Sequence, residues 1–124
     1  MPRTKTVLYR EDDGSVPLLA WLDSIPDKAR DKCVALIERL REMGHELRRP
    51  EADFLRDGIY ELRAALQGIN YRVLYFFHGR EAVILSHGVL KERVVPPKDI
   101  ERAIARKRKF EATPQKHTYG ELES

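Results

Sequence analysis

The chain has 124 residues, of which 35% are charged and 42% hydrophobic, and its net charge at pH 7 is +3. This length predicts one globular domain with its own core. A net charge of +3 does not by itself indicate nucleic-acid binding, so the positions of the cations have to decide. The N-terminus lacks a signal peptide's apolar run, and no stretch approaches the roughly 20 apolar residues that cross a bilayer. We therefore expect a cytoplasmic protein without membrane contact. The single cysteine, Cys33, excludes an intrachain disulfide and is expected to be buried in a helix.

The first third of the chain predicts a strand followed by two helices. A strand is expected over residues 6–10, and Ser15 is a candidate N-cap for a short helix with Pro17 in its first turn. A longer helix follows, in which apolar residues recur at three- and four-residue spacing up to Met43, and Gly44 suits its C-terminal end. Because the break between the helices is short, we expect them to fold back on each other as a hairpin.

Three strands are expected in the middle of the chain. Residues 45–57 are polar and charged with little periodicity, and they are predicted to form a long connection. Alternating side chains then predict strands over residues 59–66, 70–77 and 82–91. In the first of these, Glu61 and Arg63 are expected on the face opposite to Leu62's.

The chain is expected to end in a helix and a loose tail. The helix begins near Asp99 and continues to about Glu111. Residues 1–112 are thus predicted to form the whole domain, and residues 113–124 a flexible C-terminal tail. The predicted fold class is α+β, in the order β-α-α-β-β-β-α, with an N-terminal helical hairpin and a C-terminal helix packed on one face of a small, twisted, mostly antiparallel sheet.

Several common kinds of site are not indicated. No glycine-rich phosphate loop follows a strand, and the four histidines are far apart in the sequence, so neither a metal site nor a cofactor is expected. Ser86 and His87 are neighbours on a predicted strand, which would place their side chains on opposite faces and disfavour a Ser-His catalytic pair.

Cationic side chains on the three strands are the strongest functional signal. Arg63 and Arg72 lie on adjacent strands of a predicted hairpin, and Lys91 and Arg93 lie at the end of the third strand. Such residues can simply be solvated or protect sheet edges. Four of them converging on a small sheet, with Tyr71 beside Arg72, favour a site for a phosphodiester.

Cations of this kind suit RNA cleavage without a metal. The ribose 2′-OH attacks the neighbouring phosphate, a base takes its proton, an acid protonates the leaving 5′-oxygen, and guanidinium groups bind the non-bridging oxygens. The sequence leaves the general base open among Glu61, His87 and Lys91.

The final helix carries a second group of cations. Four recur at three- and four-residue spacing and are expected on one side of the helix: Lys98, Arg102, Arg106 and Lys109. This side is either a solvated face or an electrostatic footprint on RNA, which Arg48 and Arg49 could extend; contact with an acidic part of a partner protein is the competing interpretation.

Three motifs occur in order: Tyr-Glu-Leu-Arg at residues 60–63, Tyr-Arg at residues 71–72 and His-Gly-x-x-Lys at residues 87–91. With the element order predicted over about residues 5–111, this spacing resembles the phage-derived, HigB-like branch of the RelE/ParE toxin superfamily. Family members often have a second Lys, a Phe and a Tyr where this chain has Glu92, Val89 and Phe110.

The resemblance implies the toxin of a type II toxin–antitoxin system, an endoribonuclease that cleaves mRNA on the ribosome without a metal. It implies Arg63, Arg72 and Lys91 as functional residues, with Arg93 supplying the charge that Glu92 does not. It also implies a helix-turn-helix antitoxin as partner. Because the same fold hosts gyrase inhibitors, a non-enzymatic ParE-like inhibitor or an inactive antitoxin-binding module is the alternative.

Overall fold

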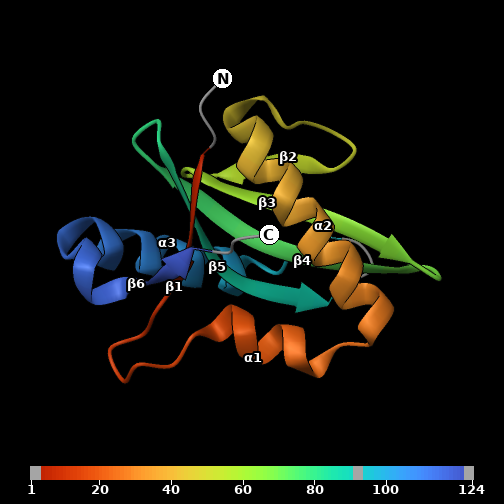
Figure 1. Ribbon diagram of the computed structural model, residues 1–124, viewed down its shortest axis with the longest axis horizontal. Coiled ribbons are helices and arrows are strands. Elements are labelled where there is room, and N and C mark those ends of the chain that lie inside the picture. Colours follow the sequence, from red (N-terminus) through yellow and green to blue (C-terminus); the bar gives the residue numbers. More distant parts are fainter. Residues whose placement is uncertain (1–3, 91–93, 122–124) are drawn as a thin grey trace.

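The computed structural model describes residues 4–90 and 94–121, and these form one six-stranded sheet with helices on both sides (Figure 1). The elements in chain order are β1 (Lys5–Tyr9), α1 (Pro17–Ser24), α2 (Asp27–Met43), the 3-10 helix η1 (Gly44–Glu46), β2 (Ala52–Arg56), β3 (Ile59–Leu66), β4 (Ile69–His78), β5 (Ala82–Leu90), α3 (Pro97–Ala112), the 3-10 helix η2 (Pro114–His117) and β6 (Thr118–Glu121). The α+β class is confirmed, and the three central strands lie within one residue of their predicted bounds.

The strand order in the sheet is β2-β3-β4-β5-β1-β6. Only β1 and β5 run parallel among these neighbours, so the prediction of a mostly antiparallel sheet is confirmed. Two strands were not predicted. One is β2, which lies in the segment expected to be a long connection, and the other is β6, which lies in the expected tail.

Two-residue turns explain the β2-β3-β4 meander. Asp57 and Gly58 connect β2 to β3 with φ angles of 51° and 81°, and Gln67 and Gly68 connect β3 to β4 with 52° and 79°. Two successive residues of positive φ are typical of the tight turns that match the twist of a β-hairpin, and Asp-Gly is a preferred sequence for them. The Asp57-Gly58 pair was therefore a sequence signal for β2.

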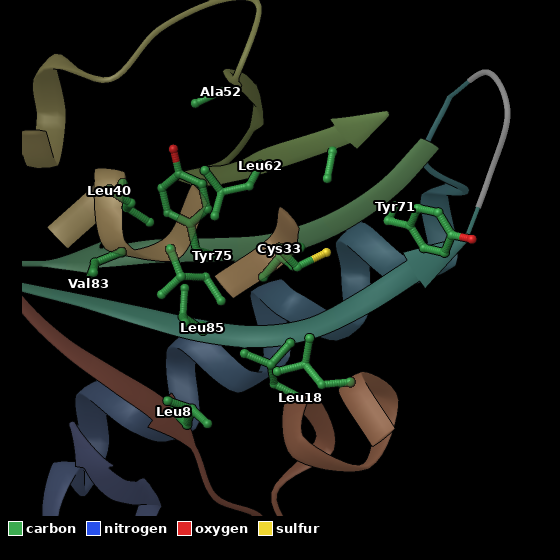
Figure 2. Packing of buried hydrophobic residues seen from close by; sticks show 14 of the residues in the cluster. Leu8, Leu18, Cys33, Leu40, Ala52, Leu62, Tyr71, Tyr75, Val83 and Leu85 are labelled. Atoms are coloured by element: carbon green, nitrogen blue, oxygen red, sulfur yellow. The ribbon is translucent and has the colours of Figure 1, made fainter. Parts of the chain in front are cut away.

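Each face of the sheet has its own core. The larger one lies under α1 and α2, where Cys33 and Leu40 of α2 face Leu62 and Tyr75 of the sheet (Figure 2). The second lies on the opposite face, where α3 packs through Ala103 and other apolar residues. The prediction that all helices cover one face is wrong, because the alternating strand residues are apolar on both sides of β4 and β5.

The predicted helical hairpin is also different. α1 packs mainly on β5, while α2 packs on β3 and β4, and the two helices contact each other little. Gly88 of β5 explains the position of α1, since the ring of Trp21 occupies the space where a side chain at this position would stand. Val16 is the N-cap residue of α1, not Ser15, whose hydroxyl instead donates to Asp13.

Residues 113–121 belong to the folded domain, which differs from the flexible tail predicted for residues 113–124. β6 pairs with β1, and the ring of His117 stacks on Tyr9 with centroids 5.1 Å apart. His117 Nδ1 also donates to the carbonyl oxygen of Arg10 at 2.8 Å. Tyr9 and His117 are buried, so this segment completes the sheet edge. No helix among the described residues is long and apolar enough to cross a membrane.

Candidate functional site

Arg63 and Arg72 are cross-strand partners of β3 and β4, on the face that α3 covers in part. The carboxylate of Glu61 joins them. Arg72 Nη1 donates to Glu61 Oε1, and Arg63 Nη2 donates to Glu61 Oε2, both at 2.7 Å. The predicted convergence of these two arginines is therefore found, and we call Glu61, Arg63 and Arg72 the arginine cluster.

The members of the arginine cluster differ in access to solvent. The side chains of Glu61 and Arg72 are 3% and 5% exposed, whereas that of Arg63 is 33% exposed. Charge-assisted hydrogen bonds of this length are strong, and each oxygen of Glu61 accepts one. Glu61 is therefore placed to orient two guanidinium groups, and this orienting role has more support than the general-base role for which Glu61 was one of three candidates.

The arginine cluster continues to the edge strand β2. Asp53 Oδ2 lies 3.9 Å from Arg63 Nη2 and 2.9 Å from Arg49 Nη2. The hydrogen bond from Arg49 is the main cause that lowers the pKa of the Asp53 carboxyl. Arg48 and Arg49, which were predicted to bind RNA, both line a groove of about 580 Å³ beside β2. The two predicted cation groups at the arginine cluster and at residues 48–49 are thus neighbours.

A β-bulge brings Ser86 and His87 together, contrary to the sequence prediction. Leu74 of β4 pairs with His87 but Tyr75 pairs with Leu85, so Ser86 is an extra residue in β5. Because the bulge interrupts the alternation of side chains, Ser86 Oγ lies 2.8 Å from His87 Nδ1. The assumption of a regular strand was wrong at this point.

His87 lies in a buried polar network beneath α3. Arg106 Nη1 approaches Nδ1 at 3.0 Å, and since a guanidinium only donates, Nδ1 is the acceptor and Nε2 carries the proton. Nε2 then donates to Asp99 Oδ1 at 3.3 Å. Burial, and then the nearby Arg106, lowers the pKa of His87 to about 4. His87 is therefore neutral at pH 7 with both nitrogens engaged, which fits a role in holding α3 on β5 better than acid–base catalysis.

The four cations predicted along α3 do not form one open face. Arg106 is mostly buried, with Nη2 2.8 Å from Glu11 Oε2, and Lys109 Nζ lies 3.1 Å from Asp12 Oδ2. Lys98 and Arg102 are exposed, although Arg102 Nη1 lies 3.5 Å from Asp99 Oδ1. The loop after β1 therefore neutralises the C-terminal half of the predicted RNA-binding side.

Two predicted residues cannot be placed, and several partners were not predicted. Lys91 and Arg93 lie outside the described residues. Sequence reasoning missed Asp53, Asp99 and Glu11 as ion-pair partners. The short spacing of Asp99 from Arg102 and of Arg49 from Asp53 was an available signal, whereas no local pattern indicates Glu11, which is 95 residues from Arg106. Among the described residues, no group of three or more His, Cys, Asp or Glu side chains is arranged to hold a metal ion.

Comparison with known proteins concerns the stretch from α1 to α3. The comparison with curated proteins found no match. Residues 20–108 match the family described as "Phage derived protein Gp49-like (DUF891)", and this range contains the arginine cluster, both residues of the Ser86-His87 bulge and most of α3. The chain therefore belongs to the Gp49-like, phage-derived family, a family of toxin–antitoxin toxins related to the RelE/HigB type.

Proposed function

We propose that this protein is the toxin of a type II toxin–antitoxin system and that it cleaves mRNA on the ribosome without a catalytic metal. The observation that carries the proposal is the arginine cluster, in which a buried carboxylate holds two guanidinium groups side by side. Guanidinium forks match the geometry of a phosphate better than a point charge does. Membership of the Gp49-like family supports the toxin–antitoxin context.

In the proposed reaction, the 2′-hydroxyl loses its proton to a general base and its oxygen forms a bond to the adjacent phosphorus. The bond from phosphorus to the 5′-oxygen breaks, and a general acid protonates that oxygen. The products are a 2′,3′-cyclic phosphate and a 5′-hydroxyl. Arg63 contacts the non-bridging oxygens, because it is the member of the arginine cluster with an exposed side chain. Arg72 acts indirectly, because it donates a hydrogen bond to Glu61, which in turn orients Arg63. Lys91 or Arg93 supplies the remaining positive charge.

The proposed partners are the ribosome with its mRNA and a helix-turn-helix antitoxin that neutralises the toxin. Of the four cations predicted to bind RNA along α3, Lys98 and Arg102 are exposed and are not paired with the loop after β1, so they are the proposed contacts to ribosomal RNA. The cationic groove at Arg48 and Arg49 adds a second contact on the β2 side.

One observation favours a second candidate. Glu61 already accepts a hydrogen bond from each guanidinium group, so a phosphate has only the remaining donors, those of the partly exposed Arg63 above all. This is the arrangement expected of a non-enzymatic member, either a gyrase inhibitor of the ParE kind or an antitoxin-binding module without activity.

In vitro translation distinguishes the candidates. The purified protein is added to a translation reaction, and the 5′ ends of the mRNA are mapped by primer extension. Under our proposal, new mRNA ends appear only when ribosomes are present, and the Arg63→Ala variant produces them about 10²–10³-fold more slowly. Intact mRNA together with a loss of DNA supercoiling in a gyrase assay contradicts the proposal and supports gyrase inhibition.

A further inference from the structure

A groove of about 580 Å³ lies at the β2 edge of the sheet, and its lining is both aromatic and cationic. The side chains that matter here are His45, Arg48, Arg49, Asp53, Phe54 and Tyr60. The groove is separate from the arginine cluster but next to it, since Asp53 lies between Arg49 and Arg63.

The aromatic rings of the groove are held in place by one another. Phe54 meets Tyr60 in an edge contact with centroids 5.1 Å apart, and Tyr60 stacks on Tyr75 at 5.4 Å. His45 stacks on Phe77 at 3.6 Å. Phe54 nevertheless remains 53% exposed. The ring of Phe54 is therefore packed against Tyr60 and still has a large surface exposed to solvent.

The charges of the groove are mainly positive. Arg48 is exposed, and the side chain of Arg49 is 78% exposed. The one carboxylate among these lining residues, that of Asp53, is already paired with Arg49 at 2.9 Å. Two arginines and one carboxylate line the groove, so its net charge is positive, and Asp53 links Arg49 to Arg63 of the arginine cluster.

Aromatic rings interleaved with arginines are the combination that binds single-stranded nucleic acid, because bases stack on the rings while the backbone follows the cations. A duplex keeps the faces of its bases within its own stack and does not offer them to a ring. Phe54 and Tyr60 lie on the face of the sheet opposite to Arg63, so a strand bound at Arg63 would reach the groove by passing around the β2 edge, along Asp53 and Arg49.

We propose that this groove binds an unpaired base of an RNA strand, stacked on Phe54, with the neighbouring phosphates held by Arg48 and Arg49. The inference rests on the proposed function and deepens it, since it makes the substrate single-stranded on the β2 side of the cleaved bond. Phe54 is then a binding residue that affects affinity and not the chemistry of cleavage.

Binding of a short 2′-O-methyl RNA oligonucleotide, followed by fluorescence anisotropy, tests the inference without depending on cleavage, because the methyl group blocks attack by the 2′-oxygen. Phe54→Ala is expected to weaken binding about 5- to 150-fold, which corresponds to the loss of one stacked base. Phe54→Trp is expected to bind within a few-fold of the wild type.

Two comparisons make the test specific. Tyr119→Ala removes an aromatic side chain that is 47% exposed on the opposite edge strand, β6, and should leave RNA affinity unchanged. In addition, a series of oligonucleotides is made in which each member lacks one base. The wild-type protein should bind one of them as weakly as Phe54→Ala binds the intact oligonucleotide. For that member the Phe54→Ala change should have no further effect.

The inference is overturned if Phe54→Ala, with an unchanged melting temperature, binds the oligonucleotide like the wild type, or if the wild type does not bind it. It is also overturned if Phe54→Ala keeps RNA affinity but loses affinity for the antitoxin, because the groove would then dock a protein. If the wild type binds RNA through Phe54 yet leaves mRNA uncut during translation, this inference is supported and the proposed nuclease function fails.

Discussion

Replacing Glu61 by Gln tests whether one buried carboxylate holds the arginine cluster together. The change keeps the size of the side chain but removes the charge that faces Arg63 and Arg72. Two guanidinium groups then lie beside each other on paired strands without the carboxylate that joins them.

The expected loss of stability follows from burial. Removing one partner of a buried ion pair costs about 3–5 kcal/mol. Arg63 is partly exposed and can turn toward water, so we expect the lower end, about 3 kcal/mol in the free energy of unfolding. For a domain of this size that corresponds to a fall in melting temperature of roughly 10 °C.

Urea denaturation of Glu61→Gln, Arg72→Gln and the double variant measures the effect and its origin. Because the two side chains share a buried hydrogen bond, the double variant should lose about 1–3 kcal/mol less than the sum of the single losses. Asp57→Asn is the matched control, since it breaks an exposed pair with Arg56 and should change stability by less than about 1 kcal/mol. A Glu61→Gln loss as small as that of the control, or additive effects of Glu61 and Arg72, would refute the reasoning.

Three further predictions concern the site and its surroundings. Arg63→Ala should reduce mRNA cleavage during translation about 10²–10³-fold while the protein stays folded, and cleavage within a few-fold of the wild type contradicts its role. Lys98→Gln combined with Arg102→Gln should reduce the slope of the logarithm of the ribosome-binding constant against the logarithm of salt concentration, measured by co-sedimentation. The reduction should be about 0.7–0.9 for each phosphate that the variant no longer binds. Arg106→Gln, by contrast, should lower stability and leave that slope unchanged. His87, whose pKa of about 4 lies below the ordinary 6.5, is neutral in the folded state while the unfolded chain binds a proton as the pH falls through this window. The contribution of His87 to the free energy of unfolding should therefore drop by about 3 kcal/mol from pH 6.5 to pH 4. Urea titrations at the two pH values should show that His87→Gln lacks most of this drop. Equal pH dependence of the two proteins would contradict a neutral His87 in the folded state.

Local patterns were sufficient for the parts of the fold that depend on local chemistry. Strands β3, β4 and β5 are runs of strand-forming residues separated by glycine-containing turns, so their bounds and the position of Arg63 and Arg72 on adjacent strands could be predicted. By contrast, β2 has five residues, and its buried side is marked mainly by Ala52. The turn at Asp57-Gly58 was the better signal for that strand, because it requires a hairpin partner on each side.

Partners that are distant in the sequence could not be predicted. β6 is ordered by pairing with β1, at the other end of the chain, and not by its own composition. The side of α3 predicted to bind RNA was judged from helical spacing, which carries no information on the acidic loop that meets Arg106 and Lys109. The bulge at Ser86 likewise breaks the two-residue period on which every inference about strand faces depends.

The charge balance of the arginine cluster explains how a paired site can still bind a phosphodiester. Arg63 and Arg72 together carry two positive charges and Glu61 one negative charge, so the cluster retains a single positive charge. A phosphodiester brings one negative charge and can be bound at the exposed part of Arg63 without breaking either 2.7 Å hydrogen bond to Glu61. In Arg63→Ala the remaining Glu61–Arg72 pair is neutral and buried. That variant should lose affinity for the phosphate and still fold, which is why Arg63, and not Arg72, is the residue whose replacement separates function from stability.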